Sequence, residues 1–140
     1  MKILVPVDGS AYSLKSVETA CDLAKSQPPS SIVLVAAAVE IPELGEGRFI
    51  YEKMKSQAES ALAKAKEAAQ GQGCAAEVIL ATGPSPAEEI VEVAKKEKAD
   101  LIVIGSRGLG AKTQSFIGST ASKVVTYSPC SVLVVKLQAD

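Results

Sequence analysis

Apolar residues gather in five short runs along the chain, and each run is bounded by glycine, proline or small polar residues. The runs cover residues 2–7, 31–39, 75–82, 101–104 and 131–136. Their apolar character is continuous, which is typical of parallel strands that are buried on both faces of a sheet. The pattern therefore predicts five buried strands. Pro6 indicates that the first strand ends or bulges there, because proline cannot donate a hydrogen bond to a neighbouring strand.

Between these runs the apolar residues recur every three or four positions, which is the spacing of an amphipathic helix. Helices are expected over residues 11–25, 48–70 and 86–98, and a last helix follows the loop after the fourth strand and ends near Tyr127. Ser10 and Ser85 are placed to cap two of these helices, because a serine hydroxyl can accept a hydrogen bond from a free N–H of the first turn. Glu88 stands three residues after Ser85, so we interpret it as part of a capping box rather than as a catalytic acid.

The alternation of strands and helices predicts a single α/β domain over residues 1–140. We expect a doubly wound, five-stranded parallel sheet with strand order 3-2-1-4-5 and helices on both faces. In such sheets a ligand binds beyond the carboxyl ends of the strands, where the strand order reverses. With this order the reversal lies between the first and fourth strands, so Asp8 and Gly105 should meet there.

The loop after the fourth strand is long and rich in glycine and hydroxyl side chains. Its spacing is glycine, two residues, glycine, nine residues, glycine and two hydroxyl residues, at Gly105, Gly108, Gly118, Ser119 and Thr120. A strand, a glycine-rich loop and a helix N-terminus together bind phosphate, because free N–H groups and the positive end of the helix dipole converge there. Arg107 and Lys112 would add positive charge. The alternative is a mere connection, but ordinary connections have about 2–6 residues and this loop is longer.

Asp8 ends the first strand and would lie across the crevice from the phosphate loop. A carboxylate would repel phosphates, so we expect Asp8 to accept hydrogen bonds from the hydroxyls of a ribose. The base would then rest on Val7 and on the end of the second strand at Ala38 and Val39, where backbone groups can read its edge. The alternative is that Asp8 is a turn residue that is hydrogen-bonded to its own backbone.

The composition argues against several classes of function. The chain carries a net charge of −1 and no basic block, so the electrostatic signature of a nucleic-acid-binding protein is missing. No apolar run reaches the length of a membrane span and no signal peptide precedes the first strand, so we expect a cytoplasmic protein without membrane contact. Histidine is absent, which excludes Ser-His-Asp and Cys-His catalysis and histidine-ligated metal sites.

Three cysteines, at Cys21, Cys74 and Cys130, are odd in number and form no C-x-x-C pair, so neither a zinc site nor a full set of disulfides is indicated. Cys21 shares a helical face with Val17 and Ala20, which favours a place in the core. A redox role for Cys130 is the remaining alternative for these thiols.

Four segments of the chain are similar to the universal stress protein family, namely I-L-V-P-V-D-G-S, G-P-S-P-A-E-E-I, A-D-L-I-V-I-G-S-R-G-L-G and S-P-C-S-V-L-V-V. The loop spacing, G-2x-G-9x-G-S/T, resembles that of the branch that binds ATP. This resemblance implies an adenine nucleotide alpha hydrolase-like, Rossmann-like fold that binds ATP, ADP or AMP, usually with Mg²⁺ or Mn²⁺, whose protein ligands it does not identify. The residues that match the family's ATP site are Pro6, Val7, Asp8, Ala38, Val39, Gly105, Arg107, Gly108, Gly118, Ser119 and Thr120.

The resemblance also implies a homodimer, because similar proteins pair their fifth strands. The matching residues here are Val132, Leu133, Val134 and Val135. Pairing would cover an apolar edge that otherwise invites aggregation. The chain departs from the family where it has Ala36-Ala37 in place of a frequent Leu-His pair, and where Tyr127 and Ser128 precede Pro129 in place of a histidine and alanine. The first departure affects the fit around the base.

The expected function is a nucleotide-binding module whose occupancy signals stress or energy state to a protein partner that the sequence does not identify. Phosphoryl transfer needs a positioned nucleophile and a group that orients or deprotonates it, and we assign no catalytic residue. Two alternatives stay open. One is an ATPase or nucleotidyl transferase completed by Glu43 or Glu46 from the loop at residues 40–47, and the other is a partner-binding dimer with an empty or AMP-filled site.

Overall fold

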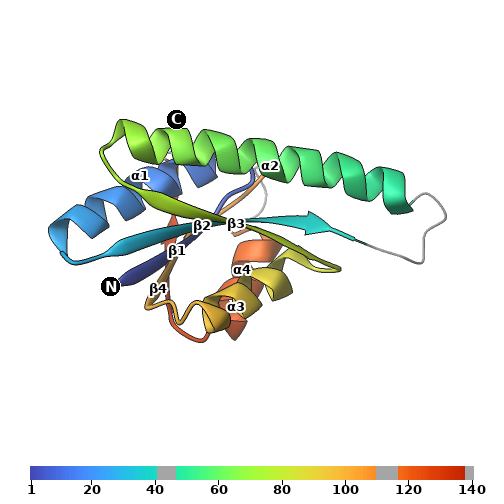
Figure 1. The fold of residues 1–140 in the computed structure, drawn as a ribbon. Coiled ribbons are helices and arrows are strands. Elements are labelled where there is room, and N and C mark those ends of the chain that lie inside the picture. Colours follow the sequence, from blue (N-terminus) through green and yellow to red (C-terminus); the bar gives the residue numbers. More distant parts are fainter. Residues whose placement is uncertain (41–46, 110–116, 138–140) are drawn as a thin grey trace.

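The computed structural model describes residues 1–40, 47–109 and 117–137, and in these ranges strands and helices alternate (Figure 1). The strands are β1 (Lys2–Pro6), β2 (Ser31–Val39), β3 (Ala76–Gly83), β4 (Leu101–Gly105) and β5 (Ser131–Val135). The helices are α1 (Ala11–Ser26), α2 (Gly47–Gly71), α3 (Pro86–Lys96) and α4 (Ser119–Tyr127).

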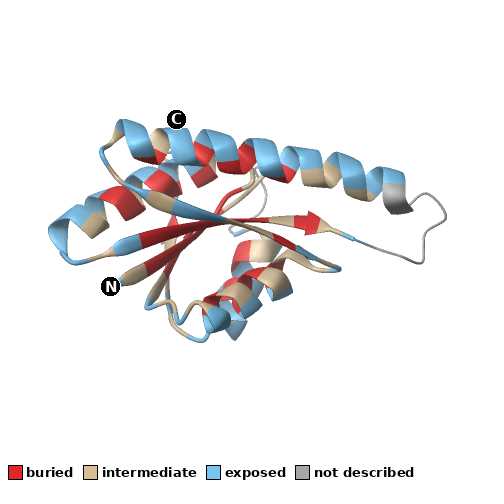
Figure 2. Cartoon of the chain, in the orientation of Figure 1, coloured by how far each residue is buried: buried red, intermediate tan, exposed pale blue. Residues whose placement is uncertain are grey.

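The five described strands form one parallel sheet in the order β3-β2-β1-β4-β5, which confirms the predicted topology. Helices α1 and α2 cover one face of the sheet, and α3 and α4 cover the other (Figure 1). Alternate residues of each strand serve the two layers: Ile3 and Val5 pack toward α1 and α2, whereas Leu4 packs toward α3 and α4. Figure 2 shows the resulting buried stretches along the central strands.

Serine residues cap α1 and α3 as predicted. The Ser10 Oγ accepts a hydrogen bond from the Ser13 amide at 3.2 Å, and the Ser85 Oγ accepts one from the Glu88 amide at 3.5 Å. Helix α3 ends at Lys96, two residues before the predicted end. Lys98 adopts a φ of 53°, a left-handed conformation through which a right-handed helix cannot continue.

Helix α2, with 25 residues, packs through a narrow stripe of small residues. Its buried residues are Ala58, Ala61, Leu62, Ala65 and Ala69. Between them lie mostly exposed polar and charged side chains, which is the amphipathic pattern expected of a helix on a sheet. None of the helices in the described ranges has both the length and the apolar character needed to cross a membrane.

Strands β1 and β4 separate toward their carboxyl ends. All five residues of β1 pair with β2, whereas only Ile3 and Leu4 pair with β4. The Val7 N–H donates to the Val35 carbonyl of β2 at 2.8 Å. Because successive residues of a strand direct their N–H groups to opposite neighbours, the nitrogen of Pro6 faces β4, where proline has no hydrogen to donate. The crevice expected at the reversal of strand order therefore opens immediately after Leu4.

Candidate functional site

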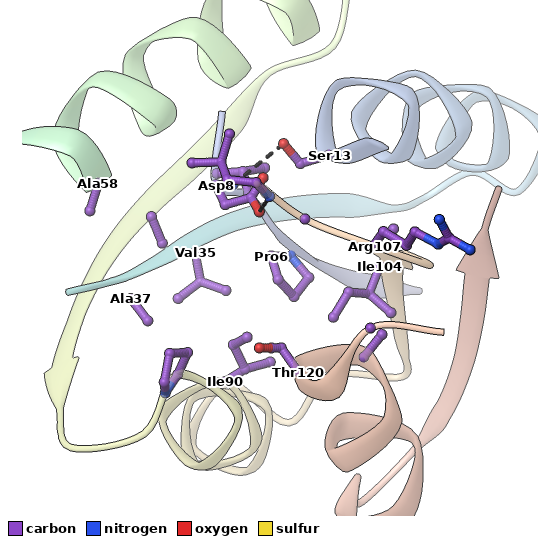
Figure 3. A pocket seen from close by; sticks show the side chains of 18 of the residues that line it. Pro6, Asp8, Ser13, Val35, Ala37, Ala58, Ile90, Ile104, Arg107 and Thr120 are labelled. Carbon is purple, nitrogen blue, oxygen red and sulfur yellow. Dashed lines mark hydrogen bonds between the residues drawn. The ribbon is translucent and has the colours of Figure 1, made fainter. Parts of the chain in front are cut away.

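A cavity with a volume of about 620 Å³ opens where β1 and β4 separate. This volume lies within the range of about 300–1,000 Å³ that is usual for small-molecule sites. Figure 3 shows that the walls come from both layers of the fold, with Ala58 of α2 on one side and Ile90 of α3 and Thr120 of α4 on the other. The cavity therefore extends across the carboxyl edge of the sheet rather than lying under one face.

Most of the residues predicted for the site line this cavity. They are Pro6, Val7, Asp8, Val39, Gly105, Arg107, Gly108, Gly118, Ser119 and Thr120. Ala38 is the exception, because its side chain is wholly buried in the layer beneath α1 and α2. Its neighbour Ala37 lines the cavity instead.

The register of β2 shows which of its backbone groups face the β1 side at the cavity. The Glu40 N–H donates to the Gly83 carbonyl of β3 at 2.9 Å, so even-numbered residues at this end of β2 direct their backbone groups toward β3. Ala37 and Val39 direct theirs toward the β1 side. The last pair between β1 and β2 is Pro6 with Val35. In the described sheet, Ala37 and Val39 therefore have no strand partner on the β1 side. Their N–H and carbonyl groups border the cavity.

The carboxylate of Asp8 links the end of β1 to the glycine-rich loop. Its Oδ1 accepts the N–H of Ser10 at 2.9 Å, and its Oδ2 accepts the N–H of Leu109 at 3.0 Å. The first contact is the local turn bond that we considered as the alternative for Asp8. The second joins the two strand ends that the predicted order brings together. Each carboxylate oxygen has a second lone pair, so both contacts leave acceptor capacity for a ligand.

The start of the loop and the start of α4 are joined by backbone hydrogen bonds. The Ser106 carbonyl accepts the N–H of Gly118 at 2.6 Å, and the Ser106 N–H donates to the Val135 carbonyl of β5 at 2.7 Å. A Cβ on Gly118 would lie 3.3 Å from the Ser106 carbonyl oxygen, so glycine allows the two segments to approach closely. The N–H of Gly118 is therefore occupied by the protein itself.

Helix α4 begins at the cavity without a capping side chain. Its N-cap residue, Gly118, has none to offer, and the first turn contains no acidic residue. The N–H groups of Ser119, Thr120 and Ala121 have no acceptor within the helix, as at every helix start, and all three residues line the cavity. In Figure 3 the Thr120 hydroxyl points toward the interior of the cavity. The positive end of the helix dipole therefore faces the cavity together with a hydroxyl donor.

Arg107 lines the cavity, but Figure 3 shows its guanidinium pointing away from the cavity's centre. Lys112, which was expected to add a second positive charge, lies outside the described residues, as do Glu43 and Glu46.

Several residues of the cavity were not assigned to the site from the sequence, although the Ala36-Ala37 pair was expected to affect the fit around the base. They are Ser13, Val35, Ala36, Ala37, Met54, Gln57, Ala58, Pro86, Ile90, Ile104, Leu109 and Ala121. Most are apolar residues at strand or helix spacing, and that spacing alone assigns them to the core. Gln57 carries a detectable signal, because it is a polar residue between Met54 and Ala61 on the inner side of α2.

Two thiols outside this cavity, Cys21 and Cys74, lie close to each other. Cys21 is wholly buried, as predicted, and burial raises the pKa of its thiol from 9.0 to about 12, with the nearby Cys74 adding to the effect. The Cys74 thiol donates a weak hydrogen bond to the Cys21 carbonyl at 3.8 Å. In the described part of the chain, no group of three or more histidine, cysteine, aspartate or glutamate side chains could hold a metal ion.

Comparison with known proteins gives consistent matches over nearly the whole chain. The model of the universal stress protein family matches residues 1–136. Universal stress protein MJ0531 of Methanocaldococcus jannaschii is 37% identical, covering 96% of this chain and 81% of its own. A universal stress protein of Thermus aquaticus, encoded in the QAH/OAS sulfhydrylase 3′ region, is 40% identical, covering 96% of this chain and 97% of its own.

Two solved structures share the fold. Hypothetical protein MJ0577 superposes with a TM-score of 0.83 and 27% identity, covering 99% of this chain and 97% of its own. A universal stress protein in complex with cAMP superposes with a TM-score of 0.75 and 27% identity, covering 96% of each chain. These likenesses extend over the strands and helices that form the cavity.

Proposed function

The chain belongs to the universal stress protein family, and from this membership we propose that the cavity between β1 and β4 binds an adenine nucleotide. ATP is the ligand that we expect, with ADP and AMP as ligands of the same site. The observation that carries the proposal is the start of α4, where N–H groups without an acceptor in the helix and the Thr120 hydroxyl border the cavity that Asp8 also lines. N–H groups at a helix start suit phosphate, whereas a carboxylate suits the hydroxyls of a sugar.

The base would lie toward β2 and the facing side of α3. Val35, Ala37 and Ile90 line this part of the cavity and offer an apolar surface for a flat ring. The backbone groups of Ala37 and Val39 would supply the donors and acceptors that read the edge of the base. This arrangement supports binding of a purine. The role predicted for Ala38, reading the edge of the base, would then belong to Ala37.

The solved complex of a universal stress protein with cAMP supports the ligand class. Like ATP, cAMP combines adenine, ribose and phosphate, so one site can accommodate the parts that the two ligands share. The number of phosphates would then depend on the donors at the start of α4 and in the loop before it.

A divalent cation, Mg²⁺ or Mn²⁺, would accompany a diphosphate or triphosphate. Magnesium keeps several water ligands and is commonly held by one or two carboxylates together with substrate phosphates. Asp8 is the carboxylate among the described residues that line the cavity. The phosphates themselves would therefore supply most of the non-water ligands, and the cation would neutralise their charge.

We propose nucleotide binding, rather than rapid turnover, as the function, with occupancy reporting stress or energy state to a protein partner. Efficient phosphoryl transfer needs a group that positions or deprotonates the nucleophile. Asp8 already accepts two backbone N–H groups, which supports a binding role over that of a general base. The alternative is an ATPase completed by Glu43 or Glu46. A measurement of ATP turnover distinguishes this enzyme from a protein that only binds the nucleotide.

We also propose that the protein forms a homodimer through β5. This strand is at an edge of the described sheet, and its Leu133 is 39% exposed. An edge strand presents unpaired N–H and carbonyl groups to which another strand can bind. Pairing of two β5 strands would satisfy these groups and cover the apolar side chain.

Thermal unfolding with added nucleotides tests the ligand class. ATP at about 100 times its dissociation constant should stabilise the protein by about 2.7 kcal/mol, and mass spectrometry of ligand released from protein purified without added nucleotide would identify the natural occupant. The control is GTP at the same concentration. If ATP, ADP, AMP and cAMP all leave the melting temperature unchanged, the proposal is wrong. Turnover near the enzyme median of about 10 per second would favour the ATPase.

A further inference from the structure

We propose that Asp8 is a positioning residue for the glycine-rich loop, in addition to any contact that it makes with a sugar. Its carboxylate holds Gly108 and Leu109 beside the end of β1. Asp8 would therefore contribute to nucleotide affinity even when the ligand offers it no hydroxyl group. This inference rests on the proposed nucleotide site and specifies how that site is assembled.

The first observation is a hydrogen bond between segments that are far apart in the sequence. Asp8 Oδ2 accepts the N–H of Leu109 at 3.0 Å, across 101 positions. Hydrogen bonds to an ionised acceptor are about twice as strong as those between neutral groups. The last pair between β1 and β4 is Leu4 with Ile102, and beyond it the two segments no longer pair as strands. The contact between Asp8 and Leu109 joins them again after this gap. It therefore fixes how far Gly108 and Leu109 stand from β1.

The second observation is the space at Gly108. A Cβ built on Gly108 would lie 2.3 Å from Asp8 Oδ2, far below any van der Waals contact. The backbone of Gly108 does not adopt the left-handed conformation that itself favours glycine. A side chain at position 108 would therefore have to displace the carboxylate from its hydrogen bonds, and glycine avoids that displacement. This gives one glycine of the loop motif a role toward Asp8.

The third observation is that the carboxylate is held in this orientation from its other side. Asp8 Oδ1 accepts the Ser10 N–H at 2.9 Å, and the Asp8 N–H donates to the Ser13 Oγ at 3.4 Å. The Ser13 Oγ in turn donates to the Ser10 carbonyl at 3.0 Å, and both serines are buried. The start of α1 thus fixes Asp8, and Asp8 holds the described start of the loop at Leu109. One carboxylate connects β1, α1 and the phosphate-binding segment.

The test separates loop positioning from contact with ribose. Isothermal titration compares wild type with Asp8→Ala, using ATP and 2′,3′-dideoxy-ATP, which keeps the base and the triphosphate but lacks both ribose hydroxyls. If Asp8 positions the loop, Asp8→Ala weakens binding of the dideoxy nucleotide by about tenfold or more, as expected for loss of a hydrogen bond to a charged acceptor. If Asp8 acts only through the sugar, dideoxy-ATP binds both proteins equally, and the proposal is wrong.

Asp100→Ala is a matched control for this experiment. Asp100 Oδ2 accepts the N–H of Lys2 at 2.7 Å across 98 positions, so it makes the same kind of carboxylate–amide bond at the opposite end of the sheet. This variant loses a comparable bond but should leave the affinity for both nucleotides within about twofold of wild type. An equal loss of affinity in both variants would assign the effect to general destabilisation and contradict the proposal.

A measurement without ligand tests the contact itself. In NMR spectra of the ligand-free protein, the Leu109 amide proton should exchange with solvent about tenfold faster in Asp8→Ala than in wild type or Asp100→Ala. Unchanged exchange would overturn the positioning role. If wild type binds neither nucleotide, the proposed function fails, whereas this readout still decides whether Asp8 holds the loop.

A double-mutant cycle adds a second criterion. Gly108→Ala should disturb the loop in wild type, because its Cβ displaces the carboxylate, and should weaken dideoxy-ATP binding by about tenfold. In the Asp8→Ala background the same change meets no carboxylate and should cost less than about twofold. Additive losses would show that the two residues act independently and would contradict the proposal.

Discussion

A Cβ atom built on Gly105 would lie 2.7 Å from the Cβ of Tyr12, so the end of β4 and the first turn of α1 meet at a distance that no side chain allows. The Cβ of Tyr12 cannot rotate away, because it is fixed to the helix backbone. We predict that Gly105→Ala lowers the free energy of unfolding by about 1–3 kcal/mol, which urea denaturation measures.

Gly71→Ala is the matched control for this prediction. A Cβ at Gly71 meets no other atom within 4 Å, and the residue ends helix α2. Its replacement should leave the free energy of unfolding unchanged or raise it by up to about 1 kcal/mol. Equal destabilisation of the two variants would show that the contact with Tyr12 is not the cause.

Removal of the Thr120 hydroxyl should weaken nucleotide binding. Thr120→Val keeps the shape of the side chain but loses a donor at the start of α4, so we expect about tenfold weaker binding of ATP by isothermal titration. Thr126→Val is the control, because the Thr126 hydroxyl bonds to the Ser122 carbonyl of the same helix at 2.9 Å and does not line the cavity. The prediction is wrong if both variants bind ATP alike.

Enlarging Ala37 should block the part of the cavity that we assign to the base. Ala37→Leu should reduce affinity for ATP at least about tenfold while leaving the melting temperature of the ligand-free protein nearly unchanged. Ala63→Leu places the same added volume on an exposed position of α2 and should bind ATP normally. If Ala37→Leu binds ATP normally, the base does not bind beside Ala37 and this assignment is wrong.

A charge on β5 should prevent dimer formation. Leu133→Asp introduces a carboxylate into the proposed interface, where burial without a partner is costly, and light scattering should detect a monomer. Val78→Asp is the control on the opposite edge strand, β3, where Val78 is 43% exposed, compared with 39% for Leu133. A dimer that dissociates with the β3 variant instead would identify the other edge as the interface.

The buried Cys21 thiol should make stability fall at alkaline pH. Its pKa is raised from 9.0 to about 12, so the folded state retains a proton that the unfolded state loses. The stabilisation is complete below pH 9 and is lost as pH rises from 9 to 12. We therefore predict that the unfolding free energy declines more steeply over this interval in wild type than in Cys21→Ala. Parallel declines in chemical denaturation would contradict this assignment.

The sheet was predictable because its strands are continuous apolar runs separated by recognisable helix starts. Ser10 and Ser85 mark two of those starts, and both cap their helices in the structure. The approximate position of the cavity followed from strand order alone, since the reversal brings Asp8 to the loop after Gly105. These features depend on local sequence and on the handedness of connections, which a single chain reveals.

The finer placement of residues was not predictable, because it depends on long-range registers. Which backbone groups of β2 are left without a strand partner is decided by where β1 ends beside Val35, and no local pattern carries that information. Similarly, Gly118 was expected at the phosphate site, but the sequence did not reveal that its N–H is bound to the Ser106 carbonyl. Apolar residues of α2 and α3 in the cavity could not be distinguished from core residues by spacing.

Ser106 has neighbours on two sides that belong to different parts of the molecule. Its N–H is bonded to the last residue of β5, and its carbonyl is bonded to Gly118, the residue just before α4. The proposed nucleotide site lies at the Gly118 contact, and the proposed subunit interface lies on β5 at the Val135 contact. A shift of the Ser106 peptide unit would therefore change the geometry of both sites. Thermodynamic linkage then demands reciprocity: the factor by which nucleotide changes subunit association is the factor by which association changes nucleotide affinity. Such a protein would respond to its own abundance as well as to that of its ligand.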